Sequence, residues 1–524
     1  MSSNHWGRGL AASVISFAIA CIGQFPAYGQ DLLNDNIPFA AYNLKLRPYV
    51  TMPNGQRNII SMTTRPDDDR LYVTTQEGKI FAVEENAQGQ TQLVEWFNMR
   101  AAVQAATGRD LNYQNFAHGG LRNVSFHPEF ATNGKFYTSA MENRPANTAG
   151  HNYLGNSVSN VAADSAVVEW TYNHQTGQVV TNSYRELFRV NMPVYDHPVK
   201  QMKFNKHAVP GDEDYGKLYI THGDASVQSA TAGGGQNRND ALGKVLRIDP
   251  LQAGNQRYTT PGNPFNNDPS TLDEIYALGF RNPHNLAFAK DATNQSKLIV
   301  VDIGRDNMEE VNLIEAGGNY GWSNREGTFV HLPGGGYING VAPLPANEAS
   351  LGYIYPAAQF DHDAITGQGF VGVAVAGSHV IANGSDPNLQ GQYIFGDFGQ
   401  TGKIYTAKFD DMLDAVTKLD PLDPTRDHPS ELTQAPISQL RLEFDHDNNP
   451  LTPALLHDTF TSLIGNSRTD LRFGEGDAGE LYLSSKRNGT IYLATNTVPE
   501  PSALALVAFA LCAGTVARKS WLKK

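Results

Sequence analysis

A short strand pattern recurs six times along the chain. Each copy starts with a turn-forming or polar residue and continues as an alternating run of aromatic and aliphatic residues, which is typical of a half-buried β-strand. The copies occupy residues 69–73, 134–137, 216–220, 296–300, 391–395 and 479–483. Their starts lie about 65 to 95 residues apart, so the repeat extends over most of the chain.

Several copies continue through a glycine-containing turn into a second strand, which predicts β-hairpins. These turns lie at residues 78–81, 402–405 and 488–492. Because no sustained 3.6-residue apolar period accompanies the strands, the pattern predicts an all-β array. Six such units fit a six-bladed β-propeller, in which four-stranded sheets surround a central channel and long loops gather at its ends. A β-sandwich or a pair of barrels is the alternative.

The first 29 residues have the layout of a cleaved export signal. Arg8 supplies the positive charge, residues 10–22 form the apolar stretch, and residues 27–29 provide the small side chains of a cleavage site. The mature chain is then expected to start near Gln30. A lipoprotein signal that ends at Cys21 is the alternative, but the residues before this cysteine match that pattern poorly.

Residues 498–524 form a second targeting segment. Pro-Glu-Pro at 499–501 precedes about 16 mostly apolar residues and a cluster of four basic residues. The apolar stretch is short for a full membrane span of ~20 residues. This layout resembles the PEP-CTERM sorting signal, which implies sorting machinery as a partner and a transient membrane anchor. The expected location is the periplasm, cell envelope or extracellular matrix. A buried C-terminal helix is disfavoured, because clustered cations pack poorly against a core.

The composition between these two segments, which includes the domain at residues 36–497, excludes several classes of site. The only two cysteines, Cys21 and Cys512, lie in the terminal segments, so the domain has no disulfide and no thiolate metal site. Leaving out both segments removes five of the 40 basic and one of the 53 acidic residues, for a formal net charge near −17. Such an acidic domain is not expected to bind nucleic acid.

Residues 274–322 hold the strongest candidate chemistry. Arg281 and Asn282 stand before a proline and offer a cation and an amide from a rigid loop, which suits an anionic or quinonoid ligand. The acidic and glycine-rich stretches at 302–306, 309–314 and 317–322 offer carboxylates and backbone carbonyls. These are the oxygen ligands that calcium prefers.

Taken in order, these segments resemble the soluble aldose sugar dehydrogenases that use pyrroloquinoline quinone (PQQ). Residues 126–134 and 242–250 are also similar to family signatures, and the resemblance covers most of residues 40–495. It implies a six-bladed propeller that oxidises the anomeric carbon of an aldose sugar or oligosaccharide to a lactone. The electrons would pass through the quinone to an external acceptor.

The resemblance also assigns roles to individual residues. His197 is expected to be the general base, with Asp224 as the carboxylate that orients it. An imidazole held by a carboxylate is suited to removing a proton from a sugar hydroxyl. Arg281 and Asn282 are expected to contact the quinone, with Arg281 stabilising oxyanion charge. The expected calcium ligands beside the cofactor are Gly304, Arg305, Glu309 and Tyr320.

The chain departs from the family pattern at several positions. A lysine that binds the cofactor in the family falls at Gln400, although Lys403 is close enough for a gap to restore it. The aligned family residue at His118 is a glutamine or glutamate. Arg468 and Arg472 are expected to supply the remaining contacts to the cofactor carboxylates.

Two departures replace small or apolar family residues. The usual Gly-Leu-Leu-Gly run is here residues 120–123, with Arg122 as its third member, and the Gly-Gly after the catalytic histidine is Val199 and Lys200. These changes keep open the alternative of a propeller of the cell envelope that binds sugar or protein without catalysis, since fold alone does not fix function.

Overall fold

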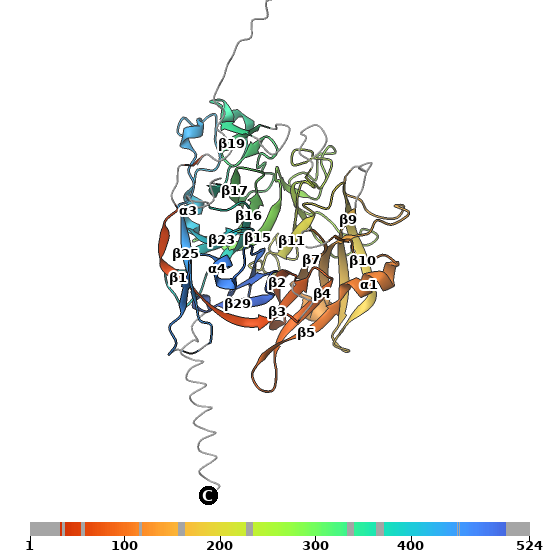
Figure 1. Cartoon of the computed structure of the whole chain (residues 1–524). Coiled ribbons are helices and arrows are strands. Elements are labelled where there is room, and N and C mark those ends of the chain that lie inside the picture. The colour runs from red at the N-terminus through yellow and green to blue at the C-terminus, as the bar shows by residue number, and fades with distance from the viewer. Residues whose placement is uncertain are drawn as a thin grey trace, which may run out of the picture.

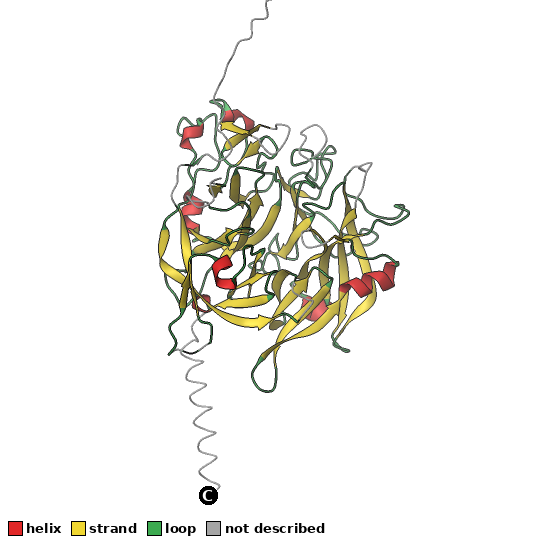
Figure 2. Cartoon of the chain, viewed as in Figure 1, coloured by secondary structure: helices red, strands yellow, loops and turns green. Residues whose placement is uncertain are grey.

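Strands are the main regular elements of the computed structural model, and its few helices are short (Figure 2). The structure describes residues 32–33, 37–53, 58–114, 118–155, 163–226, 234–332, 340–362, 371–447, 449 and 451–498. The expected export signal and, apart from its first residue, the sorting segment lie outside these residues. The predicted all-β class is confirmed. Within the described part, no helix is both long and apolar enough to cross a membrane.

Three sheets come from the middle of the chain. The first is β6 (Tyr113–Gln114), β7 (His118–Phe126), β8 (Lys135–Glu142), β9 (Ala163–Asn173) and β10 (Gln178–Met192). The second is β11 (Val199–Phe204), β12 (Leu218–His222), β13 (Lys244–Ile248) and β14 (Ile275–Leu278). The third is β15 (Pro283–Lys290), β16 (Ser296–Ile303), β17 (Met308–Ile314) and β21 (Ala358–Asp361).

A thirteen-stranded mixed sheet joins both ends of the described chain. One run is β2 (Ile59–Arg65), β3 (Asp68–Thr75), β4 (Lys79–Glu85) and β5 (Thr91–Asn98). Another is β22 (Val375–Val380), β23 (Gln392–Asp397), β24 (Ile404–Lys408) and β25 (Ile437–Phe444), with β26 (Leu455–His457) beside it. The last is β27 (Leu471–Glu475), β28 (Leu481–Ser485), β29 (Thr490–Ala494) and β1 (Phe39–Thr51).

The remaining elements are small. They are the sheet of β18 (Arg325–Glu326), β19 (Phe329–Leu332) and β20 (Gly340–Pro343), the helices α1 (Met99–Thr107), α2 (Phe130–Asn133), α3 (Phe409–Asp414) and α4 (Phe460–Ile464), and the 3₁₀ turns η1 (Glu348–Leu351), η2 (Pro429–Glu431) and η3 (Thr495–Thr497).

The N-terminal strand ties the two ends of the fold together. β1 pairs antiparallel with β29 and parallel with β25, and Figure 1 shows this red strand against the blue strands from the end of the chain. The edges of two neighbouring strand runs are therefore closed by a segment that comes from the opposite end of the sequence.

Six strands, which we call the inner strands, contact one another in a closed series. The order is β2, β7, β11, β15, β22 and β27, and β27 contacts β2 again. Each inner strand is followed by an antiparallel partner, and these partners are β3, β8, β12, β16, β23 and β28. All six repeated sequence patterns fall in these second strands. The three predicted hairpins are confirmed as β3–β4, β23–β24 and β28–β29.

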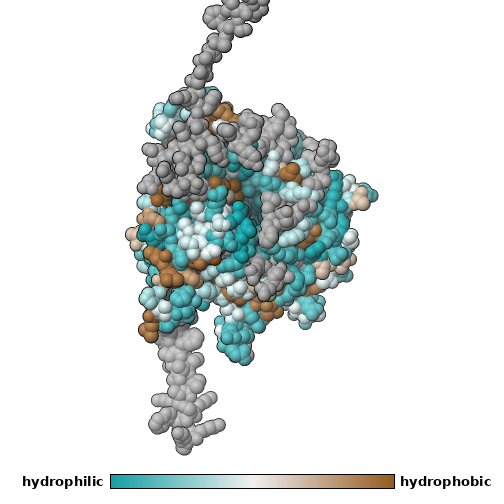
Figure 3. Space-filling view, viewed as in Figure 1, coloured by the Kyte–Doolittle hydropathy of each residue, from teal (hydrophilic) through white to brown (hydrophobic). Residues whose placement is uncertain are grey.

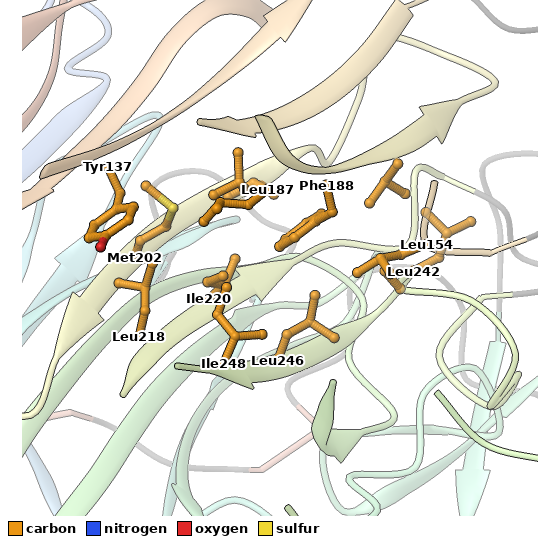
Figure 4. Close-up of a cluster of buried hydrophobic side chains, with 14 of the residues drawn as sticks. Tyr137, Leu154, Leu187, Phe188, Met202, Leu218, Ile220, Leu242, Leu246 and Ile248 are labelled. Atoms are coloured by element: carbon orange, nitrogen blue, oxygen red, sulfur yellow. The ribbon is translucent and has the colours of Figure 1, made fainter. Parts of the chain in front are cut away.

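Apolar side chains fill the space between neighbouring sheets. The cluster in Figure 4 lies between the sheets that contain β10 and β12, and Leu187, Phe188 and Ile220 are buried there. Strands covered on both faces are apolar on both faces, as the buried run Leu298, Ile299, Val300 and Val301 of β16 illustrates. Polar residues cover most of the described surface in the view of Figure 3.

Candidate functional site

The predicted catalytic residues gather at one end of the inner strands. His197 lies just before β11, Asp224 just after β12, and Arg281 just before β15. Because β11 and β12 are antiparallel, the start of one and the end of the other lie at the same edge. β11 also contacts β15, which brings Arg281 to that edge.

The ring of His197 is held by a fully buried carboxylate. Its Nδ1 lies 2.7 Å from Oδ1 of Asp224, so the predicted contact between these residues is present. The other carboxylate oxygen, Oδ2, accepts a hydrogen bond of 2.9 Å from the indole N–H of Trp322, and Oδ1 accepts another from the backbone N–H of Ser226. Asp224 is thereby fixed and in turn fixes the ring of His197.

The environment keeps the imidazole of His197 neutral. Burial lowers its pKa, and the nearby Arg281 lowers it further, whereas Asp224 and Asp196 act in the opposite direction. With the Nδ1 proton directed at Asp224, Nε2 carries the lone pair. Nε2 lies 3.3 Å from a carboxylate oxygen of Asp196, which would accept a hydrogen bond once Nε2 is protonated. The neutral ring can accept a proton at Nε2.

The backbone around His197 is constrained. His197 has φ of +52°, in the left-handed region that costs a non-glycine residue on the order of 1–3 kcal/mol. A Cβ at Gly223 would lie 2.5 Å from Cβ of His197 and 3.1 Å from the backbone oxygen of Arg281. Glycine is needed at 223 because these two segments approach so closely.

Arg281 and Asn282 are positioned through their backbone. Their N–H groups donate to Oδ2 and Oδ1 of Asp302, at 2.8 and 2.6 Å. The guanidinium of Arg281 donates to the carbonyls of Ile303 and Gly304, at 3.0 and 2.6 Å. Nε of Arg281 and Oδ1 of Asn282 are buried without a hydrogen-bond partner. A buried polar atom left over in this way is suited to a ligand. The free Nε donor of Arg281 fits a quinone with carboxylate groups, whereas the free oxygen of Asn282 needs a donor on the ligand.

Two of the four predicted calcium ligands, Gly304 and Glu309, are engaged in other contacts. Glu309 places one oxygen 2.7 Å from Nε2 of His362 and accepts from the N–H of Val375 with the other, also at 2.7 Å. The carbonyl of Gly304 accepts from Arg281. The predicted ligands of Arg305 and Tyr320 are their backbone carbonyls. Within the described chain no group of three histidine, cysteine, aspartate or glutamate side chains is placed to hold a metal. The calcium assignment stays a prediction.

Glu326 holds the loop that carries Gly304 and Arg305. One of its carboxylate oxygens accepts from the backbone N–H groups of residues 305–308, at 2.7 to 3.2 Å. Burial raises the pKa of Glu326, but the hydrogen bond from the side chain of Asn307, the charge of His362 and the backbone hydrogen bonds outweigh it, so the net shift is downward. The loop is therefore built around an ionised carboxylate.

The other residues predicted to contact the cofactor differ in their exposure to solvent. Arg472 is buried, and its guanidinium carbon lies 4.4 Å from the ring centre of Phe398. Arg468 is exposed and pairs with Asp470 at 2.8 Å. Gln400 is exposed and Lys403 is partly buried. The side chain of His118 lies outside the described residues. Of Arg468, Arg472, Gln400 and Lys403, only Arg472 is buried.

The family of the chain follows from comparison with known sequences. The model of the "Glucose / Sorbosone dehydrogenase" family matches residues 57–358. The chain belongs to the glucose/sorbosone dehydrogenase family. The match includes the segments that carry His197, Asp224, Arg281 and Glu309, in agreement with the resemblance found from motifs.

The chain is distantly similar to individual known proteins. The HIPL1 protein of Arabidopsis thaliana is 24% identical over 426 residues, which are 72% of this chain and 58% of that protein. Quinoprotein glucose dehydrogenase B of Acinetobacter calcoaceticus is 25% identical over 288 residues, 52% of this chain and 49% of that protein. The chain thus spans only about half of the length of these relatives.

A solved structure shows a shared fold. The soluble aldose sugar dehydrogenase of Escherichia coli in its apo form matches with a TM-score of 0.52 and 16% identity, over 85% of this chain and 98% of that one. The match supports a shared architecture for this member of the glucose/sorbosone dehydrogenase family. At this low identity it does not assign a role to any residue.

Sequence reasoning missed several parts of the site. Trp322 closes the quoted motif at 317–322, but its bond to Asp224 depends on a contact across 98 residues. Asp196 stood beside His197 in the sequence and received no role. No sequence motif marked His362 as part of the site, because its partner Glu309 is 53 residues away.

Proposed function

We propose that this protein is a quinoprotein oxidoreductase that oxidises an aldose, free or within an oligosaccharide, at its anomeric carbon to a lactone. Pyrroloquinoline quinone would take up the electrons and pass them to an external acceptor. The observation that carries the proposal is the neutral His197, held by Asp224 and placed with Arg281 at one end of the inner strands.

We also propose that the fold is a six-bladed β-propeller. Six runs of four strands, each with the repeated pattern in its second strand, support this assignment. The closed series of inner strands supports it further, because propeller blades surround a central channel. β1 would then complete the last blade.

His197 is the group that removes the proton in the proposed reaction. Nε2 accepts the proton of the anomeric hydroxyl, and the oxygen forms a double bond to the carbon as hydride leaves that carbon. Asp224 keeps the Nδ1 proton in place and stabilises the imidazolium that results. One proton and one hydride leave the sugar, and a lactone remains.

Arg281 serves both binding and rate in this proposal. The quinone supplies the two-electron acceptor, with one carbonyl that gains negative charge. Arg281 and Asn282 would lie beside it and would offer positive charge and an amide donor. The buried leftover donor of Arg281 and acceptor of Asn282 support their role toward a ligand. We assign no step to calcium.

A second function is favoured by Gln400. Its exposed amide stands where the family has a cofactor-binding lysine, which weakens the case for the quinone. The alternative is a non-catalytic propeller of the cell envelope that binds a sugar or a protein. Export through residues 1–29 and sorting through residues 498–524 are part of both proposals.

Reconstitution separates the two functions. We expect purified protein with added calcium and pyrroloquinoline quinone to acquire the absorbance of bound quinone and to reduce a dye when aldoses are supplied. Arg281→Ala should weaken quinone binding and turnover together, because its charge acts in both the ground state and the transition state. Quinone binding without oxidation of any aldose in a panel would favour the non-catalytic function.

A further inference from the structure

A cavity in the centre of the inner strands is lined by basic residues and by no acidic ones. Five inner strands, β2, β7, β11, β15 and β27, each contribute two adjacent residues. They are Ile60 and Ser61, Arg122 and Asn123, Lys200 and Gln201, His284 and Asn285, and Arg472 and Phe473. The cavity lies further along β11 and β15 than His197 and Arg281, and neither His197, Asp224 nor Arg281 lines it.

Arg122 is the least satisfied residue of this cavity. Its side chain is 3% exposed, and its Nε and Nη1 are buried with no hydrogen-bond partner. Arg472 donates only to the carbonyl of Leu471, at 3.1 Å, among the contacts of the described chain. A buried guanidinium without a partner is costly, because water has been removed and no opposite charge replaces it.

The basic groups of the cavity also repel one another. Burial lowers the pKa of Arg122 to about 10 and that of Arg472 to about 9, and Arg122 contributes to the shift of Arg472. Burial, followed by Arg122, lowers the pKa of Lys200 to about 7. The nearby carboxylate, Asp196, already contacts His197 and Ser226. A negative charge in the cavity would offset this repulsion.

The size of the cavity limits what it can hold. Its volume is about 20 Å³, which is room for one water-sized particle. His284 lowers the net charge of the ring, because burial and the surrounding cations hold its pKa well below the ordinary value and keep it neutral. Arg122 and Arg472 remain as the cationic groups, and Lys200, whose pKa is lowered to about 7, is partly charged at neutral pH. A space of this size suits a monatomic anion better than a polyatomic carboxylate.

We propose that this cavity binds a single monatomic anion, of the size of chloride, between Arg122, Lys200 and Arg472. Arg122 and Lys200 stand at two of the positions where the chain departs from the pattern of its family. The anion joins three inner strands, β7, β11 and β27, and stabilises the fold by pairing with charges that otherwise repel.

Thermal unfolding of the protein without quinone tests the proposal. At equal ionic strength, sodium chloride should raise the melting temperature by ~1–3 °C over sodium methanesulfonate, because a ligand of the native state stabilises it. Arg122→Met should abolish the difference between the two salts. Arg426→Met, at an exposed loop position, is the matched control and should keep it.

A second variant and a direct probe guard against a folding defect. Lys200→Met should also reduce the difference between the salts, and crystals soaked in sodium bromide should show anomalous density between Arg122 and Arg472. A wild-type protein with equal melting temperatures in both salts overturns the proposal, as does a chloride effect that persists in Arg122→Met. If quinone but not chloride stabilises the protein through Arg122, the cluster belongs to the cofactor and the proposal is wrong.

Discussion

The two ends of the inner strands differ in how their charges are matched. The end away from His197 carries a cavity of about 460 Å³, and its cations have carboxylate partners. Arg65 pairs with Asp67 at 2.6 Å, and Lys203 and Lys206 both pair with Glu475. At the His197 end, the Nε donor of Arg281 and the Oδ1 acceptor of Asn282 are buried without a hydrogen-bond partner.

This difference distinguishes charged groups that stabilise the fold from charged groups that bind a ligand. Buried polar groups in folded proteins are almost always paired, so leftover groups need an explanation. At the His197 end the explanation is a ligand that completes them. At the Glu475 end, Nε and Nη1 of Arg65 are also buried without a hydrogen bond, but Asp67 and Asp68 pair with its charge, and we expect that end to contribute stability and no turnover.

The largest expected effect is the loss of the base. His197→Ala should lower kcat by about 10²- to 10⁴-fold, because a positioned general base contributes that much, while quinone absorbance is retained. Glu475→Gln at the opposite end is the control and should keep full turnover. Unchanged turnover in His197→Ala would remove the distinction between the two ends.

Gly223→Ala should have the next largest effect. The added methyl group would lie 2.5 Å from Cβ of His197, so the histidine must move. A displacement of about 1 Å can cost on the order of 10²-fold in rate. Steady-state kinetics with the folded variant measure this loss. Gly340→Ala, where φ is likewise not positive and the added methyl group would meet no atom closer than 3.9 Å, controls for the substitution alone, and an equal loss there would contradict the account.

The pH dependence of kcat/KM should show an acid limb below pH 6.5. The pKa of His197 is lowered by burial and Arg281, and only the neutral form accepts a proton, so activity falls as pH drops through that lowered pKa. Asp224→Asn removes a group that raises the pKa, and the limb should move to still lower pH. An acid limb above pH 6.5 in the wild type would contradict this electrostatic account.

Calcium tests the part of the site that is least complete. If Glu309 is a ligand, added calcium should raise the melting temperature of the wild type, and Glu309→Gln should abolish that increase. If calcium has no effect on either protein, the pair of Glu309 and His362 is structural and the calcium assignment is wrong. Calcium titration followed by calorimetry distinguishes these results.

Glu475→Gln should have the smallest effect, on stability alone. Burial raises the pKa of Glu475, but His379, Lys203 and Lys206 outweigh it and hold the pKa well below its ordinary value. The stability from these pairs is present above the unfolded pKa of ~4.3 and is lost as pH falls below it. Urea unfolding at pH 7 should show a loss of ~1–3 kcal/mol in the variant. The gap should narrow at pH 3, and a constant gap would contradict the assignment.

The sequence predicted the strand architecture better than the site. Strand periodicity and glycine turns are local signals, and all six repeated patterns occur at equivalent strands. The contact between His197 and Asp224 also followed from motif resemblance. Trp322 and His362 could not be assigned, because their partners lie far along the chain. The engagement of Glu309 by His362 and Val375 depends on how three segments pack, which no single motif reports.

The most direct test of sugar oxidation by His197 is a single-turnover measurement. Protein loaded with quinone is mixed with a saturating aldose and no external acceptor, and reduction of the quinone is followed by absorbance. The account predicts reduction that slows when the anomeric hydrogen is replaced by deuterium and that is largely lost in His197→Ala. Bound quinone that no aldose reduces, or reduction at the same rate in His197→Ala, would contradict it.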